Sequence, residues 1–184
     1  MNLEYKNYKL RKPKIDDAEG FYKISHDKEV MKYYGTTGAF CANINDAKRQ
    51  IDWCIKQFAE NAGRWIITEK SNDCYIGDIG FFDFIKEHNR AELGYRLCKK
   101  YWGKGIITNF VEQLLKWGFT ELKYNRIEAM VDVRNEGSKI VLIRNQFQKE
   151  GILRDYEFEY GHYVDLEMYL SQGDVSLKSR GRFT

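Results

Sequence analysis

Apolar residues recur along this chain with two different periods, and each period predicts a different kind of element. A repeat of three and four positions is typical of a helix that lays one apolar face on a sheet. Aspartate or asparagine just before such a repeat can accept hydrogen bonds from the first turn and so marks where the helix begins. These signals predict helices over Asp16–His26, capped by Asp16 or Asp17, over Asn45–Glu60, capped by Asn45, over Gly105–Leu122 and over Glu136–Arg144.

Runs that alternate or are continuously apolar, and that are rich in β-branched and aromatic residues, predict strands. They lie at Tyr8–Leu10, Trp65–Glu69, Tyr75–Ile85, Arg90–Cys98, Arg126–Val133, Gln148–Tyr156 and His162–Leu170. Because the polar turns SND and KEHN separate three consecutive strands, the middle of the chain should be an antiparallel meander. A strand-helix-strand crossover follows, so the expected fold class is mixed α/β, with a mostly antiparallel sheet flanked by helices.

The overall composition narrows the class of protein. A length of 184 residues suits one domain, which we place at residues 1–171, with a polar, frayed tail at 172–184. The 30 basic and 27 acidic residues are mixed and give a net charge of +3, so we expect no nucleic acid partner. No apolar run is long enough for a signal peptide or a membrane span, so we expect a cytoplasmic protein without membrane association. The 3 histidines and 4 cysteines show no metal-ligand spacing, so we expect no metal.

The stretch ELGYRLCKKYWGKGIITNF, where one predicted strand ends and the long helix begins, carries the clearest chemical signal. Gly103 and Gly105 precede the helix, whose first backbone N–H groups and dipole favour an anion, and Lys104 adds a positive charge. A dinucleotide fingerprint would need a third glycine where Thr108 stands, and the GK[ST] of a Walker loop is absent. On these residues alone, the glycines indicate either a phosphate site or only a tight strand-to-helix turn.

Further motifs accompany this loop along the chain, namely RIEAMVDVRNEGS, EGILRDY and GHYVD. Together with YWGKG they resemble the GNAT superfamily of N-acetyltransferases, and most closely the branch that acetylates the amino-terminal alanine or serine of ribosomal proteins. The resemblance runs from KLRKPKIDDAEGFYKI to VDLEMYL, which is almost the whole chain. It implies that the sheet splays between the fourth and fifth predicted strands, and that acetyl-CoA binds there as co-substrate.

The resemblance also assigns contacts with acetyl-CoA. The pantetheine arm would pair with the backbone of the strand, and the pyrophosphate would lie on the loop. The residues so assigned are Tyr95, Arg96 and Leu97 on the strand, Gly103, Lys104, Gly105 and Ile106 on the loop, and Asn135 beside the pantetheine. The chain departs from the family in two places. Lys100 stands where Gln or Arg is common, and Asn145-Gln146-Phe147 replaces Leu-Gly-Phe, so a residue other than glycine must make that turn.

Acetyl transfer needs an uncharged amine, a polarised thioester carbonyl and a proton for the leaving thiolate. By the resemblance Glu92 is the general base, because burial beside the substrate could raise its pKa toward neutrality. The alternatives are a water relay, or simple ion pairs of Glu92 with Arg90 and Arg96. Ser138 is the proton donor to the thiolate by the same resemblance, and helix capping is its alternative role. A backbone N–H near Leu97 would donate to the thioester oxygen.

The sequence leaves two classes of acceptor open. A protein amino terminus needs an open groove, whereas an aminoglycoside or polyamine needs a carboxylate-lined pocket, to which Asp46, Asp52 and Glu60 could contribute. The Tyr33-Tyr34 pair could line either one. A protein that binds CoA without catalysis is the alternative from a different class, and an aromatic-rich sheet edge allows a homodimer. The leading hypothesis is an N-acetyltransferase that acts on a protein amino-terminal amine.

Overall fold

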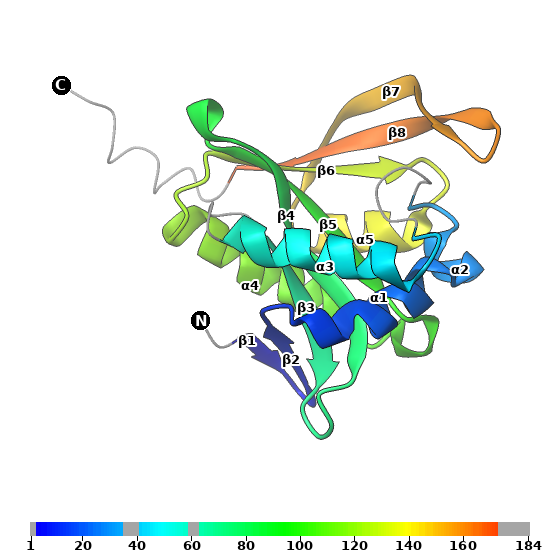
Figure 1. The fold of residues 1–184 in the computed structure, drawn as a ribbon. Helices are drawn as coiled ribbons and strands as arrows, with labels where there is room; N and C mark the ends of the chain where they lie inside the picture. Colours follow the sequence, from blue (N-terminus) through cyan, green and yellow to red (C-terminus); the bar gives the residue numbers. More distant parts are fainter. Residues whose placement is uncertain (1–2, 35–40, 59–62, 173–184) are drawn as a thin grey trace.

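The chain folds around an open sheet, which a computed structural model describes for residues 3–34, 41–58 and 63–172. The strands are β1 (Leu3–Tyr5), β2 (Tyr8–Arg11), β3 (Gly63–Glu69), β4 (Tyr75–Ile85), β5 (Arg90–Leu97), β6 (Arg126–Asp132), β7 (Gln148–Glu159) and β8 (His162–Ser171). The helices are α1 (Ala18–Ser25), α2 (Lys28–Met31), α3 (Ile44–Gln57), α4 (Ile106–Thr120) and α5 (Glu136–Arg144), with short 3-10 turns η1 (Ile15–Asp17), η3 (Lys86–His88) and η4 (Lys99–Tyr101). The order across the sheet is β1-β2-β3-β4-β5-β6-β8-β7 (Figure 1).

The sheet has two arms that separate between β5 and β6. Neighbouring strands from β1 to β5 are antiparallel, and so are the pairs β6–β8 and β8–β7. β5 and β6 are parallel and pair only over Arg90–Glu92 and Arg126–Glu128. Beyond this short ladder the strands diverge, and β6 runs with β8 away from the arm that holds β3 to β5 (Figure 1). The expected meander, the crossover and the splay between the fourth and fifth predicted strands are confirmed.

Helices cover both faces of the sheet with apolar residues at the predicted period. On one face, α4 and α5 bury Phe110 and Leu142 against strand residues such as Leu93. On the other face, α1 and α3 bury Phe21 and Ile51 against the sheet. Figure 1 shows α1 and α3 in front of the strands and α4 behind them.

The amino-terminal elements differ most from the sequence prediction. The pattern does not predict β1, because its turn into β2 lacks the glycine typical of short hairpins, and Lys6 takes the left-handed conformation there at φ 51°. α2 is a single turn, too short for a periodic signal, and the Asp27 side chain caps it. The cap of α3 is Asn43, not Asn45, since the Asn43 side chain accepts from the Asp46 N–H at 3.1 Å.

Asp17 precedes α1 but does not cap it with its side chain. Its carboxylate accepts from the Lys14 N–H at 2.7 Å and pairs with Arg11, also at 2.7 Å, so it closes η1 instead. The predicted tail falls beyond the part of the chain that the structure describes, except for residue 172.

Gln146 makes the turn after α5, where the family branch has glycine. It is left-handed, with φ 61°. Its N–H donates to the Ile143 carbonyl at 3.0 Å, and the Phe147 N–H donates to the Leu142 carbonyl at 3.1 Å. These two bonds form a Schellman motif, in which the Gln146 position usually holds glycine. The departure from Leu-Gly-Phe therefore leaves the turn in place.

Candidate functional site

The candidate site begins where β5 loses its strand partner. Glu92 and Glu128 form the last pair of the β5–β6 ladder. From Leu93 to Leu97 no strand among the described residues pairs with the edge of β5 that faces β6. An extended chain with amide groups can add to such an edge as an extra strand. This is the feature that the expected pantetheine site requires.

Alternate residues of β5 present their backbone groups to this open edge. The Cys98 N–H donates to the Ile76 carbonyl at 2.8 Å, which places Cys98 on the β4 side. Because successive strand residues turn their N–H and C=O groups to opposite edges, Arg96 also faces β4, whereas Tyr95 and Leu97 face the gap. Of the three residues expected to pair with the pantetheine, Tyr95 and Leu97 are suitably placed and Arg96 is not.

The loop after β5 leads into a helix that begins without a side-chain cap. Gly103 and Gly105 are left-handed, at φ 72° and 75°, a conformation in which glycine carries no steric cost. Gly105 is the cap residue of α4, and the first turn of α4 holds no acidic residue. Ile106 buries its side chain in the core, so the backbone N–H groups of this turn remain for an anion. Lys104 is exposed beside them, with its Nζ 5.1 Å from the centre of the Tyr101 ring.

The start of α5 forms the opposite wall of the gap. The Asn135 Oδ1 accepts from the Ser138 N–H at 3.1 Å, so Asn135 caps the helix and the Ser138 hydroxyl is not used for capping. The Tyr95 side chain crosses the gap, and its hydroxyl donates to the Ser138 carbonyl at 3.3 Å. Burial raises the pKa of Tyr95, which keeps the phenol neutral. β5 and α5 are thus tied together across the splay.

Glu92 lies at the closed end of the gap and does not form the ion pairs considered from the sequence. Arg90 lies 3.3 Å from a carboxylate oxygen of Glu128. Arg96 pairs with Asp78 at 2.7 Å. Both arginines are therefore engaged elsewhere, and the ion-pair alternative for Glu92 is wrong.

The surroundings of Glu92 favour its protonated form. Burial is the largest cause that raises the pKa of Glu92 to about 8, and the charges of Asp83, Glu128 and Glu157 raise it further, while Arg90 lowers it. These carboxylates come from β4, β6 and β7, so only the register of the sheet brings them near Glu92. A carboxyl group that titrates near neutral pH is suited to accept a proton from an amine.

Arg96 belongs to a buried ionic cluster on the face covered by α1 and α3. The Asp78 carboxylate lies 2.7 Å from Arg96 and 2.7 Å from Arg64. The Arg96 Nη1 donates to the Ser25 hydroxyl at 3.1 Å, and its guanidinium lies 4.3 Å from the centre of the Phe21 ring. Burial alone would raise the pKa of Asp78, but the two guanidinium groups outweigh it, and the pKa is lowered. The Arg96 side chain therefore fastens α1 to the sheet.

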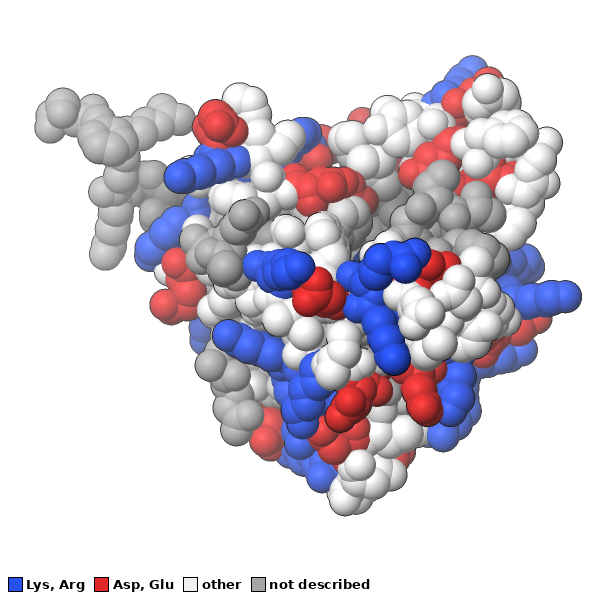
Figure 2. Space-filling view, viewed as in Figure 1, with Lys and Arg blue, Asp and Glu red and all other residues white. Residues whose placement is uncertain are grey.

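The acidic residues suggested for an acceptor pocket are already paired on α3. Asp46 pairs with Arg49, and Asp52 pairs with Lys56 at 2.6 Å. Glu60 lies outside the described residues. Figure 2 shows acidic side chains gathered in the upper part of this face, between β4 and the β7–β8 hairpin.

The two neighbouring tyrosines after α2 have different surroundings. Tyr33 lines a small pocket together with Arg134 and Glu157, on the side of the sheet where the acidic residues gather. Tyr34 lies over the Arg96 guanidinium, 5.1 Å from the ring centre, and so belongs to the buried ionic cluster. Of this pair, only Tyr33 lines that pocket.

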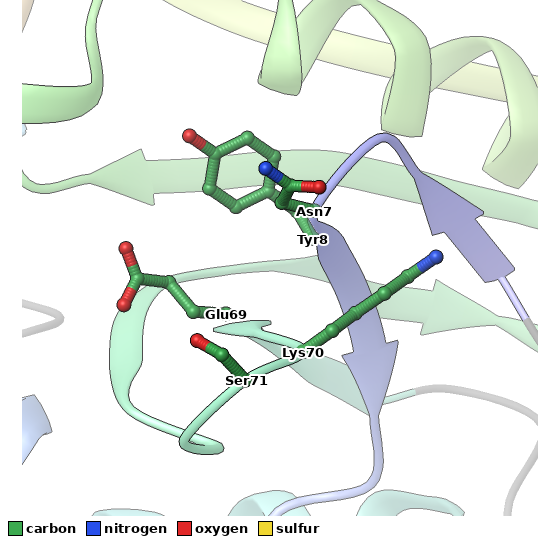
Figure 3. Close-up of a pocket in the computed structure, with 5 residues that line it drawn as sticks. All are labelled: Asn7, Tyr8, Glu69, Lys70 and Ser71. Carbon is green, nitrogen blue, oxygen red and sulfur yellow. The ribbon is translucent and has the colours of Figure 1, made fainter.

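A wider hollow, of about 490 Å³, lies away from the splay, at the turns that join β1 to β2 and β3 to β4 (Figure 3). Its lining residues are Asn7, Tyr8, Glu69, Lys70 and Ser71. Figure 3 shows the Glu69 and Lys70 side chains pointing to opposite sides, so these charged groups do not converge on one point. The Glu69 carboxylate accepts from the Tyr101 hydroxyl at 2.9 Å, which gives it a structural role beside the loop.

The described residues offer neither a metal site nor a membrane-spanning helix. Among the described residues, no group of three or more His, Cys, Asp or Glu side chains could hold a metal ion. In the same part of the chain, no helix is long and apolar enough to cross a membrane. None of the four cysteines, Cys41, Cys54, Cys74 and Cys98, forms a disulfide in the described part of the chain.

A family model for the GNAT acetyltransferase domain matches residues 8–148. This chain belongs to the GNAT family of acetyltransferases. A relative described as uncharacterized N-acetyltransferase p20, from Bacillus licheniformis, is 38% identical over 161 residues, which are 87% of this chain and 89% of the relative. The protein is therefore an acyltransferase, and specifically an acetyl-CoA-dependent N-acetyltransferase.

Solved structures share the GNAT fold over nearly the whole chain. RimL, a ribosomal L7/L12 α-N-protein acetyltransferase in complex with coenzyme A, has a TM-score of 0.84 at 18% identity and covers 94% of this chain and 98% of its own. Spermidine N-acetyltransferase from Vibrio cholerae, in complex with CoA and spermine, has a TM-score of 0.77 at 19% identity. The match covers 90% of this chain and 95% of that structure's chain. The GNAT neighbours of this chain therefore include both a protein acetyltransferase and a small-molecule acetyltransferase.

Proposed function

We propose that this GNAT enzyme acetylates a protein amino-terminal amine, with acetyl-CoA lying between β5 and β6. The observation that carries the proposal is the open edge of β5, which starts at Glu92 and ends beside the uncapped start of α4. One extended ligand could place its phosphates at Gly105, its amides along Leu97 and Tyr95, and its thioester toward Glu92. The coenzyme A in the RimL structure supports this use of the fold.

The loop would hold the pyrophosphate through backbone groups. The left-handed Gly103 and Gly105 leave the N–H groups of the first turn of α4, from Ile106 on, accessible, and the helix dipole adds partial positive charge. The exposed Lys104 side chain adds a full positive charge on the solvent side of the loop. Asn135 uses its Oδ1 to cap α5, so its side-chain N–H groups are the part that would contact the pantetheine.

The reaction requires one bond to form and one to break. The acceptor nitrogen attacks the thioester carbonyl carbon, the new C–N bond forms, and the C–S bond breaks with its electron pair on sulfur. Glu92, directly or through one water, takes the proton that the nitrogen loses. The Ser138 hydroxyl delivers a proton to the thiolate and regains one from solvent, while Glu92 returns its proton to solvent. The products are an N-acetyl amide and free CoA.

The donor to the thioester oxygen lies nearer to Glu92 in this proposal than the sequence suggested. Leu97 is five residues from Glu92, which is roughly 16 Å along a strand. Tyr95 faces the same open edge but is only about 10 Å away by the same measure. The Tyr95 N–H therefore replaces the Leu97 N–H as donor, a contact that is worth about 3 kcal/mol in other enzymes.

Proton affinity favours an amino-terminal amine over a lysine side chain. An α-amino group has a pKa of about 7.7 to 8.0, whereas that of lysine is about 10.4. A base with a pKa of about 8, as for Glu92, is well matched to an α-amino group and poorly matched to lysine.

A small cationic amine is the second candidate, and a specific observation favours it. The charges of Asp83, Glu128 and Glu157 act on Glu92, so a positively charged acceptor would be attracted to this end of the gap. The similarity in fold to spermidine N-acetyltransferase agrees with this candidate without deciding for it.

Substrate competition tests the proposal. The enzyme is given acetyl-CoA and one of three kinds of acceptor. The first is a peptide that begins with alanine or serine and has a free amino terminus. The second is the same peptide with a formylated amino terminus and a lysine side chain as its free amine, and the third is spermidine. We expect the highest kcat/KM for the free amino-terminal peptides and none for the formylated ones, as measured by mass spectrometry of the acetylated products. Preference for spermidine would replace the first candidate by the second, and no transfer to any amine would overturn both.

A further inference from the structure

The residue before Gly103 reaches back along the chain to the end of β5. The Trp102 indole Nε1–H donates to the Leu97 carbonyl oxygen at 2.7 Å. The Trp102 backbone is itself held, because its N–H donates to the Lys99 carbonyl at 3.0 Å. The Trp102 side chain is nevertheless 46% exposed, so burial of its apolar surface does not explain why it lies there.

The carbonyl that Trp102 occupies belongs to the open edge of β5. Leu97 faces the gap because Cys98, the next residue, bonds to β4. The indole therefore takes one acceptor of the edge along which an extended ligand would pair. The groups of this edge that stay available near the loop are the Leu97 N–H and the N–H and C=O of Tyr95.

If every N–H and C=O group along the β5 edge were available, an extended ligand could pair with that edge in more than one register. An extended ligand can shift along a strand by two residues, about 7 Å, and meet an equivalent pair of groups. With the Leu97 carbonyl occupied, the shifted register toward the loop has lost its acceptor. We propose that the Trp102 indole sets the single register in which the pantetheine arm pairs with β5, an inference that rests on the proposed function.

The position of Trp102 in the chain strengthens this assignment. It directly precedes Gly103, so one short segment carries both the phosphate loop and the group that closes the end of the edge. The spacing between the pyrophosphate and the first paired amide is then fixed in one place. Trp102 is a positioning residue: it acts through the Leu97 carbonyl and not on the reacting atoms.

The test is Trp102→Phe, which removes the indole N–H and keeps an aromatic ring. The matched control is Trp53→Phe, because Trp53 on α3 is also 46% exposed and lies outside the site. We expect kcat with acetyl-CoA to fall by about tenfold or more, because a reacting group misplaced by about 1 Å can cost a hundredfold. The dissociation constant for 3′-phospho-ADP, the nucleotide half of CoA, should change by less than about twofold, and Trp53→Phe should change neither.

Two results would overturn the proposal. One is a kcat of Trp102→Phe within about twofold of the parent value. The other is an equal loss of 3′-phospho-ADP binding and of kcat together with a lower Tm, which would mean a purely structural role. Failure of the proposed function gives a different result, in which the parent enzyme binds 3′-phospho-ADP but neither CoA nor acetyl-CoA. The inference about Trp102 then fails with it.

A second measurement does not depend on how the variant folds. In the parent protein labelled with ¹⁵N at the indole nitrogens, the Trp102 N–H should exchange slowly with water, and it should remain slow after CoA is added. The equally exposed Trp53, assigned from the Trp53→Phe spectrum, gives the fast-exchanging reference in the same sample. Loss of Trp102 protection on addition of CoA would show that the ligand displaces the indole, which contradicts a fixed register.

Discussion

Asp78 and Glu92 lie on adjacent strands and face the same side of the sheet, but they have opposite surroundings. Asp78 lies between two guanidinium groups, and its pKa is lowered although burial acts to raise it. Glu92 is half-buried beside other carboxylates, and its pKa is raised to about 8. Partners, and not depth alone, decide which charge state each carboxyl group keeps.

This difference separates a structural carboxylate from a functional one. The ionised Asp78 fixes Arg96 and, through it, Ser25 of α1, so its charge contributes to the fold. A carboxylate without a cation costs folding free energy when it is buried. Glu92 occupies such an energetically unfavourable position where β5 and β6 separate. A role in proton transfer would explain why an acidic residue stands there.

The largest expected effect is the loss of stability in Asp78→Asn. It leaves Arg64 and Arg96 buried without a carboxylate, and removal of one partner from a buried ion pair costs about 3 to 5 kcal/mol. Urea denaturation should show a lower midpoint. Asp52→Asn is the control, because Asp52 pairs with Lys56 on the exposed side of α3 and should change the free energy of unfolding by less than about 0.5 kcal/mol. Equal effects in the two variants would contradict the structural role.

The complementary variant, Glu92→Gln, should lose activity and keep the fold. We expect kcat/KM for acetyl transfer to fall by about a hundredfold, the lower end of general acid–base effects. Its Tm at pH 7 should not be lower than that of the parent protein, since an unfavourable, half-buried carboxyl group is removed. Glu19→Gln, on the exposed surface of α1, serves as the control in the same assay. Retained activity in Glu92→Gln would leave Glu92 without a catalytic role.

The difference in stability between the parent protein and Glu92→Gln should depend on pH in a definite direction. The pKa of Glu92 is higher in the folded chain, about 8, than its ordinary value of 4.5, so the folded state binds the proton more tightly. The parent protein therefore loses stability relative to Glu92→Gln as the pH rises from 4.5 to 8. Thermal melts should show nearly equal Tm values at pH 5 and a difference of at least about 4 °C at pH 9. Parallel curves would mean that Glu92 is ionised throughout.

The smallest effect should come from Asp83→Asn. The Asp83 charge is the largest of the charges that raise the pKa of Glu92, after burial. Removal of this charge should shift the midpoint of the pH profile of kcat/KM downward from about 8, by less than one unit because Asp83 is exposed and screened by solvent. An unchanged midpoint would indicate that burial alone sets the pKa.

Much of the fold could be predicted because the local periodicity of apolar residues agrees with the pairing of strands in the sheet along most of this chain. The bounds of β4 and α5 match the prediction, and those of β5, β6 and β8 differ by one residue at an end. The hairpin at Lys6 and the single turn at α2 could not be predicted, because neither is long enough to show a period. Asn43 was missed as the cap of α3, since Asn45 offers the same side chain two residues later.

The site could be predicted only where the residues are close in sequence. The loop from Gly103 to Ile106 follows from local motifs, whereas the surroundings of Glu92 depend on three other strands. The pairing of Arg90 with Arg126 sets Glu92 opposite Glu128, a register that becomes visible only when the two strands are aligned from their first residues. The backbone orientation of Arg96 needs the same kind of information, namely which edge of β5 bonds to β4.

The Tyr95–Ser138 hydrogen bond has a consequence for how fast ligands enter. It joins β5 to the start of α5 across the splay, and so it holds these two elements at a set distance. Binding that needs no rearrangement avoids the slow step that lowers association rate constants when a site must first open. Acetyl-CoA should therefore bind in a single kinetic phase whose rate rises linearly with concentration.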